Sequence, residues 1–462
     1  MEDNGEDFKK LRGKEKSGVK GTMDMTYGRP LRLMIHFAFP ILLSSVLQQL
    51  YTLFDGLIVG RFLGMNAFAA VSAAGFIAWL PQNMMLGLTH GFGIVLSRLF
   101  GAGDVKGFKK ANLLSAIVSG LFAVFFCTFL IVHCDRILDI LKLPGELKLY
   151  ATDYLYVIYL GLVFFALFNW ISSALRAMGD SKTPLVALFV SSVINISLDF
   201  ALIKVIPMGV VGPALSTVIG QAAALLYSCI VFIRKKAEFP DRNDVNMGSG
   251  LKALIYMGVP PMLRDGVIAI GGLCVQRIVN GFGTDFVGGM AAAGRYFAII
   301  SMSGGCLEGA VATFSGQNFG AGQIGRIRTG VKKAVRLSVL MAAFVIVVSW
   351  LVAPGLIYLI TGTNETKMFE LGVYALRCSL VFLPCLHLLY IYRPAIQGMG
   401  SSVTPMLSGF AELGMRILSV FCLTNWLGYT SACIADGLGW MLAAALLWAR
   451  YRMVIKKYGS DQ

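Results

Sequence analysis

Long apolar stretches, each about the length that crosses a lipid bilayer, recur along almost the whole chain. A transmembrane helix needs about 20 predominantly apolar residues, whereas soluble proteins interrupt buried segments with charge at shorter intervals. We therefore predict twelve transmembrane helices, bounded by charged residues, glycine or proline. Their approximate ranges are 33–58, 76–99, 111–133, 150–175, 184–204, 212–233, 252–279, 295–317, 333–353, 369–393, 405–427 and 430–452.

The two halves of the chain repeat the same motifs. FGAGD at 100–104 returns as FGAGQ at 319–323, and LRAMGDSKTP at 175–184 returns as IQGMGSSVTP at 396–405. The members of each pair lie about 220 residues apart, which indicates an internal duplication. Halves with six helices each insert in the same orientation. We expect an all-α integral membrane protein with two six-helix lobes related by a pseudo-twofold axis along the membrane normal, with a cleft between the lobes.

The expected domains follow from this duplication. They are a hydrophilic, disordered cytoplasmic tail at 1–28, an N-lobe at 29–236, a cytoplasmic linker at 237–251, a C-lobe at 252–453 and a cytoplasmic C-terminal tail at 454–462. The first segment lacks the apolar core of a secretory signal peptide.

The positive charge of the chain is a topology signal. The net charge is +15, and Lys and Arg are concentrated in both tails and in alternate connections between the predicted helices. The positive-inside rule places those connections and both termini in the cytoplasm, as expected for a multi-pass protein of the cytoplasmic (inner) membrane. We expect contact with the lipid bilayer and no nucleic-acid partner.

Polar side chains within the first apolar span indicate a functional face. Gln48, Tyr51 and Asp55 are spaced i, i+3, i+7, which places them on one side of a helix. A carboxylate within the bilayer costs roughly 2.5–3.5 kcal/mol on insertion scales, so Asp55 requires a compensating role.

Three further polar residues fall at the same predicted depth. Asn195 and Asp199 lie one turn apart in the fifth predicted helix, and Thr217 lies near the start of the sixth. Together with Asp55 they could share a proton, because two like charges in a dry site disfavour double ionisation. They could equally coordinate Na⁺ through oxygen ligands, or form a structural hydrogen-bond cluster.

The second half does not repeat these acids. By the repeat offset, Asp55 corresponds to Cys274 and Asp199 to Val420, so we expect the lobes to have different tasks. Glu308 has no basic neighbour in sequence and is the candidate in the C-lobe for contact with a cationic substrate, with a structural pair across helices as the alternative.

Other charges in the second half receive simpler interpretations. Glu412 and Arg416 are spaced i, i+4 and are expected to neutralise one another. Arg264 and Asp265 are adjacent, and no role is assigned to them.

Several other classes of site lack sequence support. The chain contains no G-x-x-x-x-G-K-[ST] phosphate loop, no H-E-x-x-H motif and no C-x-x-C pair, and its four histidines show no metal-ligand spacing. We therefore expect neither an enzyme nor a cofactor beyond a coupling ion.

The chain resembles a known transporter family over roughly residues 28 to 455. Pro40 followed by QQLYTLFDGLIVGRFLG, the paired FGAG loops, and LRAMGDSKTP with IQGMGSSVTP are similar to multidrug and toxic compound extrusion (MATE) transporters. The resemblance is closer to the prokaryotic DNA-damage-inducible type than to the sodium-coupled type first found in vibrios. It implies a twelve-helix, V-shaped protein that exports amphipathic, mostly cationic compounds in exchange for H⁺ or Na⁺ by alternating access.

The resemblance also implies roles for particular residues. The N-lobe cation site of that branch matches Asp55, Asn195, Asp199 and Thr217, which would be the metal ligands if Na⁺ is the coupling ion. Its substrate-contacting cavity residues match Gln48, Tyr51 and Asn169.

The chain departs from the sodium-coupled type at one place. That type has a glutamate a few residues beyond the proline of helix 7, where this chain has Arg264-Asp265 after Gly258-Val259-Pro260. The N-lobe is therefore expected to carry the coupling.

Our hypothesis is a cation-coupled, monomeric efflux antiporter for organic cations or similar amphiphiles. A flippase for lipid-linked saccharides of the same superfamily is the alternative, and a membrane-embedded enzyme is the third. The choice between H⁺ and Na⁺ depends on ångström-scale geometry that the sequence does not contain.

Overall fold

The computed structural model describes residues 21–140, 145–236, 250–362 and 367–459, and all regular structure in these ranges is helical. Residues 237–249 of the expected linker and residues 1–20 of the expected N-terminal tail lie outside the described residues. The N-lobe helices are α2 (Pro30–Phe62), α3 (Met65–Ala102), α4 (Val105–Ile140), α5 (Gly145–Ala177), α6 (Lys182–Phe200), a π-helix η1 (Ala201–Val205) and α7 (Val211–Lys236). The C-lobe helices are α8 (Leu251–Asn280), α9 (Thr284–Gly320), α10 (Ile324–Thr361), α11 (Lys367–Val381), α12 (Leu383–Gly398), α13 (Val403–Cys422), α14 (Thr424–Leu427) and α15 (Tyr429–Gly459).

The predicted all-α membrane fold with twelve spans is confirmed. Eleven described helices are long and apolar enough to cross a bilayer, and α11 with α12 forms a further span bent by 46°. Pro384 in the first turn of α12 has no amide hydrogen to donate, which interrupts the helix at Phe382.

Several helices extend beyond the ranges expected from hydropathy. The second helix begins at Met65 and not near residue 76, and the eighth begins at Thr284 and not near residue 295. Hydropathy detects only the segment that is apolar throughout. The additional turns of α3 contain the buried Ala67, Ala70 and Ala74, and alanine is the strongest helix former.

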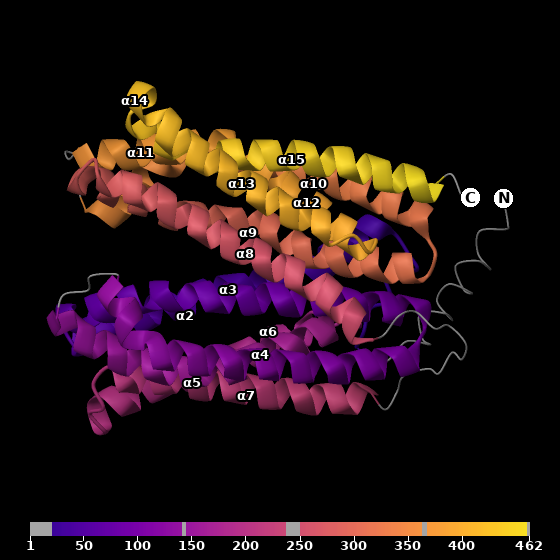
Figure 1. The fold of residues 1–462 in the computed structure, drawn as a ribbon, viewed down its shortest axis with the longest axis horizontal. Coiled ribbons are helices and arrows are strands. Elements are labelled where there is room, and N and C mark those ends of the chain that lie inside the picture. The colour runs from indigo at the N-terminus through magenta and orange to yellow at the C-terminus, as the bar shows by residue number, and fades with distance from the viewer. Residues whose placement is uncertain (1–20, 141–144, 237–249, 363–366, 460–462) are drawn as a thin grey trace.

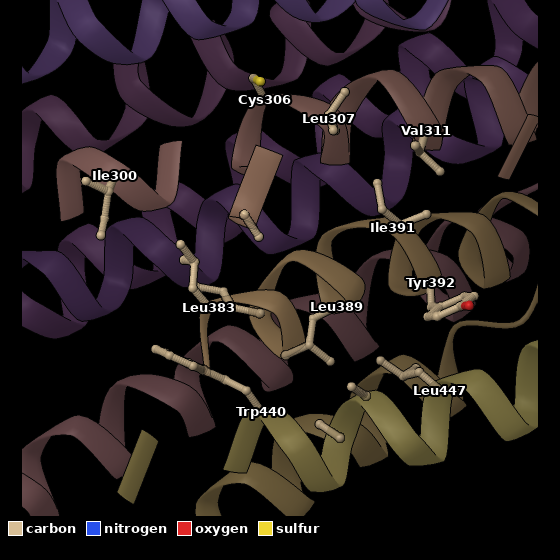
Figure 2. Packing of buried hydrophobic residues seen from close by; sticks show 14 of the residues in the cluster. Ile300, Cys306, Leu307, Val311, Leu383, Leu389, Ile391, Tyr392, Trp440 and Leu447 are labelled. Atoms are coloured by element: carbon tan, nitrogen blue, oxygen red, sulfur yellow. The ribbon is translucent and has the colours of Figure 1, made fainter. Parts of the chain in front are cut away.

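The helices form two lobes, α2 to α7 and α8 to α15, which lie one above the other in Figure 1. Each lobe has its own apolar core, and that of the C-lobe joins α9, α12 and α15 through residues such as Leu307, Leu389 and Trp440 (Figure 2). The first half of α2 contributes Met34 and Phe37 to this C-lobe core, whereas the helix also packs against α6 of the N-lobe. Helix α2 therefore contacts both lobes.

A short segment before α2, residues 21–27, holds the two lobes together. We call it the strap, and the end of the bundle on which it lies the strap end. The Met23 amide donates to the Gly179 carbonyl of the N-lobe at 3.2 Å, and the Met25 amide donates to Gln317 Oε1 of the C-lobe at 2.8 Å. These residues fall within the segment expected to be a tail, yet they contact both lobes.

Glycines bring the lobes into backbone contact at the strap end. An alanine Cβ at Gly101 of α3 would lie 2.5 Å from the carbonyl carbon of Gln317 in α9, and one at Gly320 would meet the Arg98 backbone. Only a residue without a Cβ permits these approaches. The lobes are therefore tightly closed at this end.

Candidate functional site

The polar residues predicted on three helices meet in the N-lobe. The Tyr51 hydroxyl of α2 hydrogen-bonds to Thr217 Oγ1 of α7 at 2.9 Å. The Asn195 amide of α6 donates to Thr217 Oγ1 at 3.3 Å and to Ser216 Oγ at 3.1 Å. The Ser216 hydroxyl in turn donates to Asp199 Oδ1. Helices α2, α6 and α7 therefore share one polar cluster.

The two acids of the cluster lie near one another. The carboxylates of Asp55 and Asp199 are close enough for their charges to interact. Two ionised carboxylates offer only acceptors, so they cannot hydrogen-bond to one another without a proton. Asp199 is fully buried and Asp55 half-buried, a setting in which two negative charges repel one another more strongly than in water.

Three oxygen atoms of this cluster have no hydrogen-bond donor among the described residues. They are Asp55 Oδ1, Asn195 Oδ1 and Asp199 Oδ2, and all three are buried. A buried polar atom without a partner is costly, and such atoms in folded proteins usually have a reason. Three acceptors in one cluster are chemically suited to a proton or to a small hard cation.

The local structure of α6 positions its two polar residues. Asn195 and Asp199 lie one turn apart and both point to the buried face. The π-helix η1 begins two residues after Asp199, and the Ile206 amide donates to the Ala201 carbonyl at 2.9 Å. Such π segments are rare and occur frequently at functional sites.

A glycine allows α7 to approach α6 closely. A Cβ at Gly220 would lie 2.9 Å from the Ser191 carbonyl oxygen and 3.5 Å from Asn195 Cβ. This approach places the hydroxyls of Ser216 and Thr217, one turn earlier on α7, beside the Asn195 amide.

The remaining predicted site residues do not join the cluster. Gln48 is exposed on α2, and Asn169 donates to the Phe165 carbonyl of its own helix at 2.8 Å. Glu308 belongs to α9 of the C-lobe, within electrostatic reach of Arg264 and Arg393 but without an ion pair to any described residue. Their assignment to substrate binding stays a prediction.

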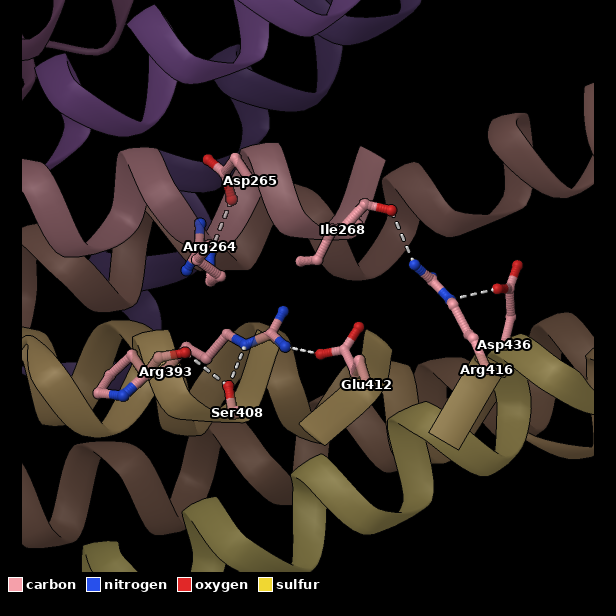
Figure 3. A network of polar contacts seen from close by, with 9 residues as sticks. Arg264, Asp265, Ile268, Arg393, Ser408, Glu412, Arg416 and Asp436 are labelled. Atoms are coloured by element: carbon pink, nitrogen blue, oxygen red, sulfur yellow. Dashed lines mark hydrogen bonds and ion pairs between the residues drawn. The ribbon is translucent and has the colours of Figure 1, made fainter. Parts of the chain in front are cut away.

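The C-lobe contains a network of ion pairs formed by three buried arginines (Figure 3). The pairs are Arg264 with Asp265 at 2.7 Å, Arg393 with Glu412, and Arg416 with Asp436 at 2.6 Å. Each arginine has a carboxylate partner, so the network compensates its own charge. Glu308 adds one further acid to this region.

The expected neutralisation of Glu412 by Arg416 is wrong. Glu412 pairs with Arg393 of α12, whereas Arg416 pairs with Asp436 of α15 and donates to the Ile268 carbonyl at 2.9 Å. Helix α13 packs against both α8 and α15, so each side chain reaches an opposite charge on a neighbouring helix.

Sequence reasoning missed several members of these sites. Ser216 lies beside Thr217 in the sequence, and nothing in the sequence distinguishes it from other serines. Tyr154 of α5 is close enough to Asp55 to interact with its charge, but it is one of several tyrosines in the same stretch of sequence. Arg393 could have been found, because it is a charged residue in the apolar run before Pro394.

The fold and these sites define a multi-pass membrane protein with two helical lobes, a class typical of secondary transporters. The family model described as MatE matches residues 40–201 and 267–422. The chain belongs to this family of MATE transporters, which confirms the resemblance and the expectation of a transporter and not an enzyme.

Curated relatives and solved structures agree with this assignment. The chain is 27% identical to "Probable multidrug resistance protein YpnP" of Bacillus subtilis (strain 168), covering 93% of this chain and 96% of that protein. It is 25% identical to "Multidrug export protein MepA" of Staphylococcus aureus (strain NCTC 8325 / PS 47), covering 90% and 93%. A structure titled "Reverse polarity of binding pocket suggests different function of a MOP superfamily transporter from Pyrococcus furiosus Vc1 (DSM3638)" has the same fold, with a TM-score of 0.86, 22% identity and coverage of 96% and 99%.

Proposed function

We propose that the protein is a multidrug efflux antiporter that exports amphipathic, mostly cationic compounds in exchange for H⁺ or Na⁺ by alternating access. The coupling ion binds at Asp55, Asn195, Asp199 and Thr217. The observation that carries this proposal is the set of three buried acceptor oxygens in the cluster without a donor among the described residues. A proton on one carboxyl group, or a sodium ion among the oxygens, would satisfy them.

Coupling follows from competition for the same negative charge. A cation bound between Asp55 and Asp199 reduces the negative charge of the site and lowers its attraction for a cationic substrate. If the two conformations of the transporter differ in affinity for the ion, the ion gradient drives the substrate in the opposite direction. Tyr51 connects the two events, because it lies on the face of α2 that carries Gln48 and hydrogen-bonds to Thr217 of the ion site.

The substrate class is supported by the relatives. Those described above are named as multidrug resistance or multidrug export proteins. We assign substrate contacts to Gln48, Tyr51, Asn169 and Glu308, with Glu308 meeting the positive charge of the compound. The transporter acts as a monomer.

The orientation follows from the distribution of basic residues. Both termini lie in the cytoplasm and the strap end faces it, because the connections at that end carry the excess of Lys and Arg. The membrane is the cytoplasmic (inner) membrane.

The flippase alternative receives less support. A flippase for lipid-linked saccharides requires cationic side chains that are available to a pyrophosphate. The three buried arginines of the C-lobe network are each paired with a carboxylate, and the N-lobe cluster is acidic.

Efflux from proteoliposomes tests the proposal. Export of a cationic dye is measured with a pH gradient and a Na⁺ gradient imposed separately, for the wild type, Asp55→Asn and Asp199→Asn. We expect one of the gradients to drive export by the wild type and neither gradient to drive export by the two variants.

A matched control is Asp139→Asn. Asp139 is an exposed carboxylate that pairs with Lys148 at 2.5 Å outside the cluster, and this variant should export like the wild type. Full gradient-driven export by Asp55→Asn would refute the coupling role, and lipid flipping without dye export would favour the flippase.

A further inference from the structure

A basic groove lies on the outside of the bundle, between the first turns of α2 and the first half of α10. Its volume is about 670 Å³. Five basic side chains line it: Arg29, Arg32, His36, Lys333 and Arg336. No acidic residue lines the groove, and none of these five side chains forms an ion pair with a described residue.

The rest of the lining is apolar. Leu31 and Ile35 of α2 face Leu337 and Leu340 of α10. The groove therefore combines cationic side chains with a hydrocarbon surface, which is unlike a site for a free, fully hydrated anion.

The apolar surface continues away from the groove along α10. Leu340, Phe344, Val347 and Leu351 repeat at intervals of four, three and four residues, which places them on one helix face. Each is at least 60% exposed. In a chain that spans the membrane, such a stripe faces the acyl chains of the lipid.

The position of the groove matches a lipid headgroup region. Arg29 lies two residues after the strap, and Pro30 begins the first membrane span. The groove thus lies where α2 enters the bilayer, and its apolar stripe runs toward the bilayer centre. Basic pockets between transmembrane helices are known to hold the headgroups of anionic lipids.

We propose that this groove binds one anionic phospholipid of the leaflet at the strap end. The phosphate lies among Arg29, Arg32, Lys333 and Arg336, and an acyl chain follows Leu340 and the exposed face of α10. The attraction of opposite charges compensates four cations that otherwise repel one another. This inference depends on membrane insertion and not on the transported compound or the coupling ion.

Native mass spectrometry of the full-length protein in detergent tests the proposal. Phosphatidylglycerol is titrated against phosphatidylcholine with the same acyl chains. We expect one phosphatidylglycerol to remain bound at least about tenfold more tightly than phosphatidylcholine, because each basic side chain near an anionic headgroup contributes about fivefold in affinity. Inorganic phosphate at millimolar concentration should not displace it, and displacement would overturn the assignment to a lipid.

A pair of variants separates the groove from general charge. Arg32→Gln with Arg336→Gln removes one cation from each side of the groove. Lys109→Gln with Lys110→Gln removes the same charge from an exposed part of α4. The groove variant should lose the preference for phosphatidylglycerol and the α4 variant should keep it. An equal loss in both variants would overturn the proposal.

A second measurement on the wild type does not depend on the folding of a variant. A phosphatidylglycerol with a photoreactive acyl chain is cross-linked, and the labelled peptides are identified. Labelling concentrated at 31–40 and 333–351 supports the site, and labelling spread evenly over the lipid-facing helices refutes it.

Discussion

Replacement of Gly101 by alanine would place a methyl group against the backbone of the opposite lobe. The new Cβ would lie 2.5 Å from both the carbonyl carbon and the Cα of Gln317, and closer still to its carbonyl oxygen. Ordinary van der Waals contact begins at 3.4 Å, so α3 and α9 must separate by at least 0.9 Å, the difference between these distances. Because the obstacle is backbone, no side-chain rotation can relieve it.

The expected effect is a shift of the conformational equilibrium. Overpacking by one methyl group typically costs about 1–3 kcal/mol, which corresponds to about 5- to 150-fold in population. The cost falls on the conformation that is closed at the strap end, so Gly101→Ala should populate the conformation that is open there. The polar cluster around Asp199 is unchanged by this substitution.

Hydrogen exchange measures this shift. The Met23 and Met25 amides of the strap donate to Gly179 and Gln317, one in each lobe, and they exchange when the lobes separate. In Gly101→Ala these two amides should exchange faster by about the same 5- to 150-fold, and gradient-driven transport should slow.

The control for this experiment lies on the same helix. Gly75→Ala adds a Cβ that meets nothing within 4 Å and should leave exchange of the strap unchanged. Equal exchange in Gly101→Ala and Gly75→Ala would show that backbone contact at Gly101 does not limit closure.

Further substitutions test three other contacts in the structure. Gln317→Ala removes the acceptor of a strap amide and should accelerate exchange of the strap and lower stability by about 1–3 kcal/mol in thermal unfolding. Lys235→Gln breaks the ion pair with Asp180 at 2.5 Å and should cost about 1.5–3 kcal/mol. Asp180→Asn breaks the same pair and also disturbs the hydrogen bonds that Asp180 accepts from Lys182 and Thr183, so it should cost at least as much, and a smaller cost would contradict this assignment. Arg393→Leu leaves the Glu412 carboxylate buried without its partner and should cost about 3–5 kcal/mol, whereas addition of Glu412→Leu should recover most of that loss in the same unfolding assay.

Much of the architecture was determined by the sequence. Apolar stretches of membrane length predicted all twelve spans, and the repeated motifs predicted two lobes of six spans each. The helical spacing of Asn195 and Asp199 placed them on one face, which the structure shows to be the buried one. The spans, the lobes and the buried helix face depend on how each residue partitions between lipid, water and protein. The order of residues along the chain determines that partitioning.

The pairing of side chains was decided by the tertiary structure. Ser216, and not Thr217, donates a hydrogen bond to Asp199, and Glu412 pairs with Arg393 and not with Arg416, which is nearer in sequence. Such choices depend on the rotation and separation of whole helices, because a polar atom bonds only within about 3 Å. Residue spacing within one helix carries no information on those quantities.

The closure of the strap end illustrates the same division. The sequence shows glycine at Gly101 and Gly320 within repeated motifs, but it does not show what either glycine contacts. In the folded chain both glycines allow backbone contact between the lobes, and the residues in contact are more than 200 positions apart in sequence. The partitioning of apolar segments into the membrane determines which segments become helices. How closely the helices meet depends on the space around each Cα, and distant parts of the chain set that space.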